Sequence, residues 1–522
     1  MKYPIGIQSF DRLIEDGFVY VDKTDMVYSL VKEGTIYFLS RPRRFGKSLL
    51  VSTLKNYFLG RKELFKGLKI DLLEKEWKVY PVFHLDFNGG NFTQKGVLEQ
   101  WINDFVSVWE EKYELKSNTE LPVGLRFVRL LEYVHDTLGC RAVVLVDEYD
   151  KPILDVLDVD KDLEEEHRNI LKGFYSVFKS ADEHLQFVFL TGVTKFSQVS
   201  VFSGFNQPFD ISMHGKYETL CGISQAELEA SFRESIDEMR KFYRCSYEEM
   251  MSMLKSQYDG YHFSDKMTDV YNPFSLLNAF STGRISDYWF KSGTPTYLIR
   301  LLAHTNENMN EITGKYYSAE EFIDYKANVE QPLPMIYQSG YLTIKDFDIE
   351  DNTFLLEYPN KEVKRGFLTM IASSYFNIGE TPSWIRSAVS NLKKGNIEDF
   401  RIGLTSFLAS IPYTMRRKEN ERERERYFHY TFYLIMRLIG VYTVYTEKVQ
   451  SHGRVDCIVE TPEYIYIFEF KLDGSVDDAM RQIEEKGYAR EYESDNRKLY
   501  KIGAVFSSET GTIEEWNMVE RN

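Results

Sequence analysis

Four short apolar segments alternate with helical stretches in residues 1–235, and few folds accommodate that order. The segments read TIYFLS, YPVFHLDF, RAVVLVDEYD and LQFVFLTGV. A helix between two strands carries the chain back to its starting edge, so that the strands pair in parallel. The sequence therefore predicts an α/β core built on a parallel sheet.

A candidate phosphate-binding loop follows the first of these strands. RPRRFGKSLL comes after TIYFLS and opens a helix. Backbone N–H groups at that helix start would face phosphates, Lys47 would reach the terminal phosphates, and Ser48 would ligate Mg²⁺. The usual pattern GxxxxGK[ST] has glycine where this chain has Arg41, so GKS alone is weakly specific. We expect the nucleotide contacts to come from Arg43, Arg44, Phe45, Gly46, Lys47 and Ser48, although both arginines could equally be basic loop residues.

Two acids end the third apolar segment. Asp147 can hold the water shell of Mg²⁺, and Glu148 can orient or deprotonate an attacking water. Alone, such a pair is often an ordinary acidic turn, but together with GKS it predicts an ATP site with Mg²⁺ on Ser48 and Asp147. Thr191 or Thr194, at the end of the fourth segment, could sense the nucleotide or simply cap a loop.

The C-terminal stretch YIYIFEFKLDG, residues 464–474, reads as a buried strand that ends in charged residues. Side chains alternate between the faces of a strand, so Glu469 and Lys471 share one face. Burial of an unpaired charge is costly. The two side chains therefore either pair with each other or help to bind something else.

GRVDCIVETPE, directly before it, can form the other strand of a hairpin and bring Asp456 close to Glu469. Two carboxylates repel each other unless a divalent cation such as Mg²⁺ or Mn²⁺ lies between them. Lys471 could then stabilise a pentavalent phosphate or position a water. The alternative is a same-face salt bridge between Glu469 and Lys471.

These motifs, with PIGIQSF, YVDKT, YDGYHF and VYNPFSL, resemble the bacterial AAA-like ATPases that carry a C-terminal PD-(D/E)XK nuclease domain. In that family RPRRFGKS replaces the glycine form of the loop. The resemblance implies an ASCE-type P-loop core, a mostly helical or winged lid, and a restriction-endonuclease-like α/β domain of order αβββαβ. The expected domains are the core at 1–235, the lid at 236–375, a helical connection at 376–415 and the nuclease-like domain at 416–522.

The resemblance also implies roles in the C-terminal domain. Asp456 and Glu469 would bind the metal, Lys471 would assist catalysis, and Gln482 on the following helix would support the site. Glu425, on a helix expected at 421–439, is a candidate second acid. The nearby His429 and His452 are read as structural.

Composition limits the partners. The 522 residues carry a formal net charge of −16, so nucleic acid must meet a local basic patch or a metal-assisted site. The mixed charges of RRKENERERERY, residues 416–427, are typical of a solvated helix start at a domain boundary. Four widely spaced cysteines, no evident signal segment and no apolar run of about 18 residues favour a cytoplasmic protein without a membrane span.

The sequence thus predicts an ATP-binding and ATP-hydrolysing protein with a metal-dependent nuclease domain that acts on nucleic acid, with DNA as the first expectation and a homo-oligomer possible. The alternative is a nucleotide-gated switch or defence-type effector, in which the nuclease fold binds nucleic acid or a partner without cleaving.

Overall fold

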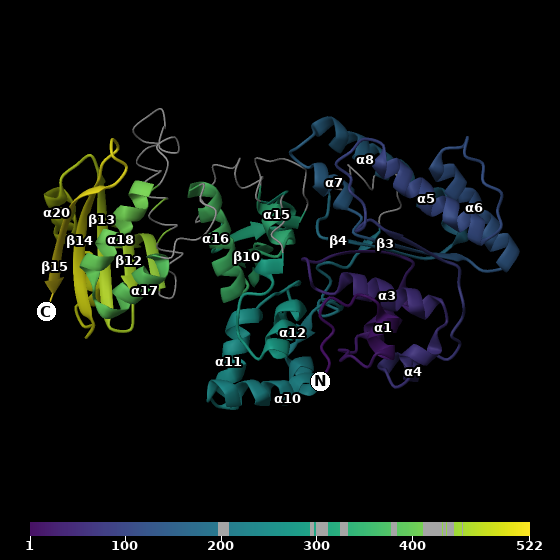
Figure 1. Ribbon diagram of the computed structural model, residues 1–522, viewed down its shortest axis with the longest axis horizontal. Coiled ribbons are helices and arrows are strands. Elements are labelled where there is room, and N and C mark those ends of the chain that lie inside the picture. The colour runs from purple at the N-terminus through teal and green to yellow at the C-terminus, as the bar shows by residue number, and fades with distance from the viewer. Residues whose placement is uncertain are drawn as a thin grey trace. The chain divides into compact units, whose positions relative to one another are not determined.

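The computed structural model in Figure 1 describes residues 1–196, 208–292, 297–298, 312–323, 332–376, 384–410, 431, 435, 443–450 and 453–521. The chain divides into two compact units, Met1–Lys364 and Arg365–Asn522.

A parallel five-stranded sheet forms the centre of the N-terminal unit. Its order is β2-β3-β4-β1-β5, so β4 lies between the strand that precedes GKS and the strand that ends in the acid pair. The predicted parallel α/β core is confirmed. The strands are β1 (Ile36–Ser40), β2 (Val82–Asp86), β3 (Ala142–Asp147), β4 (Leu185–Gly192) and β5 (Phe209–Asp210).

Helices cover both faces of this sheet, as expected for strands that are apolar throughout. Every residue of β3 is buried. In Figure 1, α1 and α3 lie on one side of the sheet and α5, α6 and α8 on the other. The helices are α1 (Phe10–Glu15), α2 (Thr24–Glu33), α3 (Lys47–Phe58), α4 (Lys69–Leu73), α5 (Val97–Lys112), α6 (Val123–Leu138), α7 (Lys151–Val156), α8 (Lys161–Tyr175) and α9 (Val177–Ser180).

The region that follows the parallel sheet consists of helices and two small sheets, and the predicted lid, 236–375, begins inside its first helix. One sheet pairs β6 with β7, and the other is antiparallel with the order β8-β10-β9. The strands β8, β9 and β10 all lie in the part of the chain for which the resemblance implies a mostly helical or winged lid. The elements are β6 (Ile223–Ser224), α10 (Gln225–Tyr243), α11 (Tyr247–Tyr258), β7 (Val270–Tyr271), α12 (Pro273–Thr282), β8 (Lys315–Ser318), α14 (Ala319–Ile323), α15 (Leu333–Gln338), β9 (Thr343–Asp348) and β10 (Thr353–Glu357).

The predicted boundary at residue 235 falls inside α10, which runs from Gln225 to Tyr243 with a kink at Phe232. The break between compact units comes later, after Lys364 and within α16 (Lys361–Phe376). The other predicted domain boundaries stay predictions.

A second five-stranded sheet, ordered β11-β12-β13-β14-β15, forms the C-terminal unit. Only the β13–β14 pair is parallel. The three strands, helix and strand of the predicted order are present, and β15 extends the sheet beyond them; the helix expected at 421–439 lies outside the described residues apart from 431 and 435. The elements are α17 (Trp384–Lys394), α18 (Ile397–Ser410), β11 (Thr443–Gln450), β12 (Gly453–Glu460), β13 (Tyr464–Leu472), α20 (Val476–Lys486), β14 (Lys498–Phe506) and β15 (Ile513–Arg521).

The two faces of β13 pack against different helices. Ile465 and Ile467 join a core with Ile483 of α20. On the other face, the Phe468 ring lies 6.3 Å from that of Phe400 in α18, and the Tyr466 hydroxyl donates to a carbonyl of α17 at 2.6 Å. The strand therefore presents its charged end, which continues the isoleucine face, towards α20.

Candidate functional sites

The loop between β1 and α3 has the backbone that a phosphate site needs. Gly46 caps α3 in the left-handed region, with φ 95°. A side chain there would be strained, and a Cβ built on Gly46 meets no atom within 4 Å. The N-terminus of α3 thus has open space beside its first N–H groups, which suits an anion.

Lys47 is buried directly behind this space. Its Nζ donates to the carbonyl oxygens of Arg41 at 3.0 Å and Pro42 at 3.2 Å. Burial lowers the pKa of the ammonium, with nearby acids acting against that shift. An ammonium held only by carbonyls gains strongly from an anion, so Lys47 is suited to phosphate.

The acids at the end of β3 lie close enough for their charges to raise the pKa of this lysine, against the larger lowering by burial. Asp147 is buried and accepts a hydrogen bond from the Ser48 hydroxyl, and burial raises the pKa of its carboxyl. Glu148 follows with φ 51°, and burial raises its pKa while the Lys47 charge lowers it. Asp86 ends the neighbouring strand in register with Asp147 and was not foreseen. The predicted loop and acid pair therefore lie together at the carboxyl edge of the sheet.

Asp150 was also missed, although it stands in the same VDEYD segment. It is 1% exposed, and its Oδ2 accepts from Val193 N at 2.9 Å, Thr194 N at 2.6 Å and Thr194 Oγ1 at 2.7 Å. The Thr191 hydroxyl donates to the Leu39 carbonyl at 2.9 Å. The Thr191 hydroxyl thus joins β4 to β1, and Thr194 joins the segment after β4 to the segment after β3.

The remaining predicted loop residues differ in exposure. Phe45 is 1% exposed, with its ring edge-on to Tyr261 at 4.8 Å and Phe263 at 5.5 Å, so its side chain belongs to the core. The side chains of Arg43 and Arg44 are exposed.

In the C-terminal unit, β12 and β13 separate beside Asp456. Their paired residues end at Cys457 and Phe468, and one further step of the same register sets Asp456 opposite Glu469. Opposite residues of an antiparallel pair share a face. The Asp456 carboxylate accepts the backbone N–H of Phe470 at 2.7 Å, which holds it at the point of separation.

One carboxylate oxygen of the buried Glu469 has no hydrogen-bond partner. The side chain is 1% exposed, and this oxygen is Oε2. Burial, and then the Asp456 charge, raise the pKa of Glu469 to about 7, while Lys471 acts against the shift. Lys471 Nζ donates to Glu469 Oε1 at 3.1 Å, so the ion pair of the simpler alternative is present as well.

Lys471 is held from a second direction by α20. Its Nζ donates to Gln482 Oε1 at 2.7 Å, and Gln482 Nε2 donates to the hydroxyl of the buried Tyr488 at 3.4 Å. Gln482 thus reaches the predicted site, and Tyr488 is an addition that sequence reasoning missed. The only signal was an aromatic residue in the turn after α20.

The two carboxylates present could bind one divalent ion, but they do not form a metal site enclosed by protein ligands alone. Among the described residues, no group of three or more His, Cys, Asp or Glu side chains could hold a metal. The pair Asp456 and Glu469, with one carboxylate oxygen lacking a partner, matches the oxygen ligands that Mg²⁺ prefers. Glu425, His429 and His452 lie outside the described residues.

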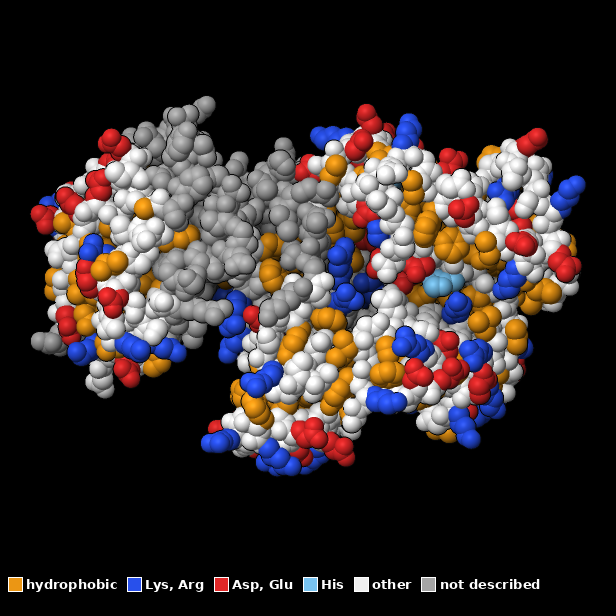
Figure 2. Space-filling view, viewed as in Figure 1, with side chains coloured by type: hydrophobic (Ala, Val, Ile, Leu, Met, Phe, Trp, Pro, Cys, Tyr) orange, Lys and Arg blue, Asp and Glu red, His pale blue; other side chains and the backbone are white. Residues whose placement is uncertain are grey.

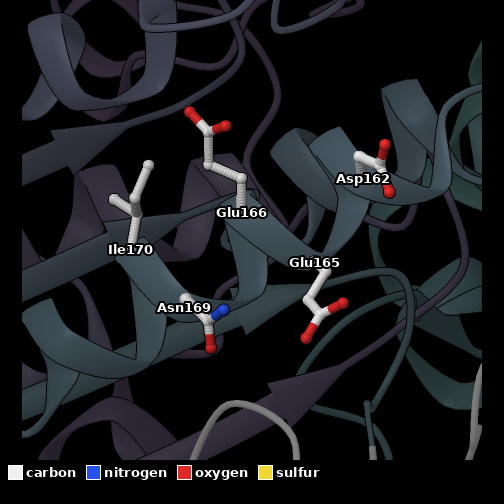
Figure 3. Close-up of a pocket in the computed structure, with 5 residues that line it drawn as sticks. All are labelled: Asp162, Glu165, Glu166, Asn169 and Ile170. Carbon is white, nitrogen blue, oxygen red and sulfur yellow. The ribbon is translucent and has the colours of Figure 1, made fainter.

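A hollow of about 560 Å³ along α8 does not belong to either site (Figure 3). Its carboxylates point away from one another in Figure 3, and Lys95 pairs with Glu166 at 3.3 Å. None of the predicted site residues lines it. The lining residues are Asp162, Glu165, Glu166, Asn169 and Ile170.

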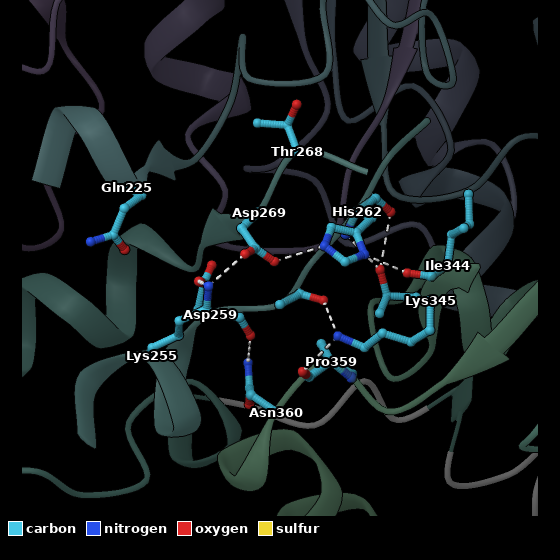
Figure 4. A network of polar contacts seen from close by, with 12 residues as sticks. Gln225, Lys255, Asp259, His262, Thr268, Asp269, Ile344, Lys345, Pro359 and Asn360 are labelled. Atoms are coloured by element: carbon cyan, nitrogen blue, oxygen red, sulfur yellow. Dashed lines mark hydrogen bonds and ion pairs between the residues drawn. The ribbon is translucent and has the colours of Figure 1, made fainter. Parts of the chain in front are cut away.

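A polar network in the lid region is likewise structural (Figure 4). His262 contacts the Ile344 carbonyl through Nδ1 at 2.7 Å and Asp269 through Nε2 at 2.8 Å. Lys255 donates to Asp269 at 2.7 Å and lies 3.9 Å from the buried Asp259. The network joins α11 to β9.

On the face that Figure 2 shows, acidic and basic side chains of the described residues are interspersed. Within the described ranges, no helix combines the length and apolar character that a bilayer crossing requires.

Comparison with known proteins agrees with this geometry. Residues 4–202 match the family described as predicted AAA-ATPase, and residues 423–516 match the PD-(D/E)XK nuclease superfamily. An uncharacterized protein in the vnfD 5′ region of Azotobacter chroococcum mcd 1 is 34% identical over 525 residues, which cover 98% of each chain. The chain therefore belongs to the family of AAA-ATPase-like proteins that carry a C-terminal PD-(D/E)XK nuclease superfamily domain.

Proposed function

We propose that this protein hydrolyses ATP in its N-terminal unit and cleaves phosphodiester bonds of nucleic acid in its C-terminal unit. The observation that carries the proposal is the buried Glu469 carboxylate, with an unpartnered oxygen beside Asp456 and Lys471. The position of the loop lysine next to the strand-end acids supports the ATPase part.

For ATP, the phosphates would lie at the N-terminus of α3, where Lys47 exchanges its two carbonyl partners for phosphate oxygens. Ser48 and Asp147 would hold Mg²⁺, which neutralises negative charge on the phosphates. Glu148 accepts the proton of the attacking water, a role that its raised pKa favours. This loop is the P-loop of the proposal.

For nucleic acid, Asp456 and Glu469 would hold Mg²⁺ or Mn²⁺, which supplies positive charge for the phosphate under attack. Lys471 stabilises the negative charge that develops on that phosphate, and Gln482 keeps the ammonium aimed at it. DNA is the first substrate to test. A cytoplasmic location and a homo-oligomer belong to the same proposal.

A second function is favoured by one contact. Lys471 already pairs with Glu469 at 3.1 Å, so the Glu469 carboxylate has a counter-charge without a metal. In that case the C-terminal unit binds nucleic acid or a partner under the control of the nucleotide, without cleaving. This switch requires Lys47 but not the chemistry of Lys471.

The test is a cleavage assay on DNA and RNA with Mg²⁺ or Mn²⁺, each with ATP, with ADP and without nucleotide. The variants are Asp456→Asn and Lys471→Met. Lys498→Ala is the matched control, because this lysine lies on the neighbouring strand with a side chain 62% exposed and pairs with Glu520. Calorimetric titration with Mn²⁺ follows metal binding separately.

We expect cleavage by the parent and by the control, and a loss of about 10²-fold or more in both site variants, since each removes a charge that the transition state needs. Asp456→Asn should also lose Mn²⁺ binding. Metal binding without cleavage in any condition would leave the switch as the function. Absence of both would overturn the nuclease proposal.

A further inference from the structure

Each of the three arginines in the loop between β1 and α3 lies over an aromatic ring of the predicted lid. The Arg41 guanidinium lies 4.1 Å from the centre of the Phe263 ring, and Arg44 lies 5.2 Å from that of Phe274. The guanidinium of Arg43 lies 5.9 Å from the ring centre of Tyr297. Each loop arginine thus has its own aromatic partner, and the three are not equivalent.

Arg41 and Arg44 are committed elsewhere. Arg41 is 2% exposed and donates to the Ser212 carbonyl at 2.7 Å, so it supports the loop from inside. Arg44 stands in the left-handed region at φ 66°, over the first turn of α12. The Arg43 side chain is exposed and stands in the loop shortly before Gly46, beside the helix start where the phosphates would lie.

Trp289 fixes the backbone of Arg43. The indole Nε1 donates to the Arg43 carbonyl at 2.9 Å, and the backbone N–H of Trp289 donates to Glu362 Oε1 at 2.6 Å. Trp289 is 6% exposed and Glu362 is 1% exposed. A buried hydrogen-bonded pair therefore sets the position from which the Arg43 side chain starts.

Tyr297 fixes the other end of Arg43. Its ring is 3% exposed, and its hydroxyl shares a hydrogen bond of 3.0 Å with Ser339. The guanidinium of Arg43 lies over this ring, whose position the bond to Ser339 and the burial of the ring both restrain. A planar cation held in this way keeps its N–H donors free for phosphate oxygens.

We propose that Arg43 contacts the terminal phosphate of ATP during hydrolysis and that Trp289 and Tyr297 are positioning residues for it. The inference rests on the proposed ATP hydrolysis. Water attacks the terminal phosphorus, the bond from that phosphorus to the bridging oxygen breaks, and ADP leaves with the bond electrons. The proton of the water passes to Glu148, and Arg43 keeps its own protons while it neutralises charge on the transferred group.

The experiment measures ATP hydrolysis and the affinities for ATP and ADP in the full-length protein. The variants are Arg43→Ala, Trp289→Phe and Tyr297→Leu, with Arg44→Ala for comparison. Arg284→Ala is the matched control, because Arg284 is an exposed arginine over another lid ring, 4.4 Å from the centre of Phe242. Guanidinium chloride at low concentration is added to each variant.

Arg43→Ala should lower kcat by about 10²–10³-fold and abolish any preference for ATP over ADP, with ADP affinity changed less than about threefold. Free guanidinium should restore part of that rate. The loss should exceed that of Arg44→Ala at least tenfold. Trp289→Phe and Tyr297→Leu should lower kcat by about tenfold at nearly unchanged KM, without rescue by guanidinium, because the arginine is present but misplaced.

Equal hydrolysis by Arg43→Ala and the parent would overturn the inference and leave the ATPase proposal intact. A parent that hydrolyses no ATP, and whose nucleotide affinity is unchanged in Lys47→Ala, would overturn both. A loss of ATP and ADP affinity together in Trp289→Phe would show a purely structural role for that residue.

Discussion

Arg41 stands where the usual phosphate loop has glycine, and its contacts explain how the loop accommodates it. The side chain turns into the protein, where it donates to the carbonyls of Ser40 at 2.9 Å, Ser212 at 2.7 Å and Tyr217 at 3.3 Å. The loop uses a side chain for support where other loops use conformational freedom.

Restoring the usual glycine should therefore harm the protein. Arg41→Gly leaves three carbonyls without their donor and opens a cavity beside Phe263, so we expect the free energy of unfolding to fall by about 2–4 kcal/mol. Urea unfolding of the full chain, followed by hydrogen exchange in β1 and α3, measures the change.

Arg284→Ala serves as the control for this prediction, with a loss of about 1 kcal/mol or less because the arginine is exposed. If Arg41→Gly is as stable as the parent, the arginine does not support the loop.

At the level of elements, the sequence predicts best where a strand or helix has one buried face. The alternation in β13 predicts that Glu469 and Lys471 share one face. The hairpin predicted from the preceding segment puts the Asp456 strand next to it, as in the structure. The small strand β8 has four residues with no fully buried side chain, and in β15 only Ile513 is buried, so neither has the period that reveals a strand.

Contacts that depend on how the chain turns and packs explain the rest of what sequence reasoning missed. Tyr488 reaches Gln482 only because a turn follows α20, and Trp289 reaches Arg43 across 246 positions of chain. Such pairs have no local signature, since their geometry depends on how the elements pack.

Two capping boxes in the lid give a matched comparison. Ser224 and Glu227 cap α10, and Ser246 and Glu249 cap α11, with reciprocal bonds in both cases. Glu227 alone also accepts from Lys23 at 2.5 and 2.6 Å, and that lysine is 7% exposed. The first box therefore carries a buried ion pair in addition to the cap.

Glu227→Gln should lower the free energy of unfolding by about 3–5 kcal/mol, because it leaves a buried ammonium without its counter-charge. Glu249→Gln should cost about 0.5–1 kcal/mol, the value of a cap on a partly exposed helix start. Thermal unfolding of both variants at one pH measures the difference. Equal losses would mean that Lys23 gains nothing from the pairing.

At the scale of the whole molecule, buried carboxyl groups make stability depend on pH. Burial raises the pKa of Asp259 to about 7 and that of Glu362 to about 7. Both side chains are 1% exposed. The folded protein thus holds these protons more tightly than the unfolded chain does.

The sign follows from that difference. A group whose folded pKa is raised stabilises the protein below its unfolded pKa, and this contribution is lost as the pH rises through about 7. Between pH 5 and pH 8 we expect the free energy of unfolding of the N-terminal unit to fall by on the order of 2 kcal/mol for each carboxyl group. The melting temperature should fall with it.

Asp259→Asn should remove part of this pH dependence, whereas Asp265→Asn, at an exposed position of the same segment, should leave it unchanged. Calorimetry at several pH values separates the two. A melting temperature that rises from pH 5 to pH 8 would contradict the assignment of raised pKa values.

Helix α16 belongs to one unit by its first turn and to the other by the rest of its length. Its second residue, Glu362, is the acceptor of the Trp289 N–H, and the same tryptophan holds the phosphate loop. The start of α16 and the loop between β1 and α3 are therefore linked through the two hydrogen bonds of Trp289. A nucleotide that tightens the loop should slow amide exchange at the start of α16, so that the helix reports the state of a site from which it is far removed in sequence.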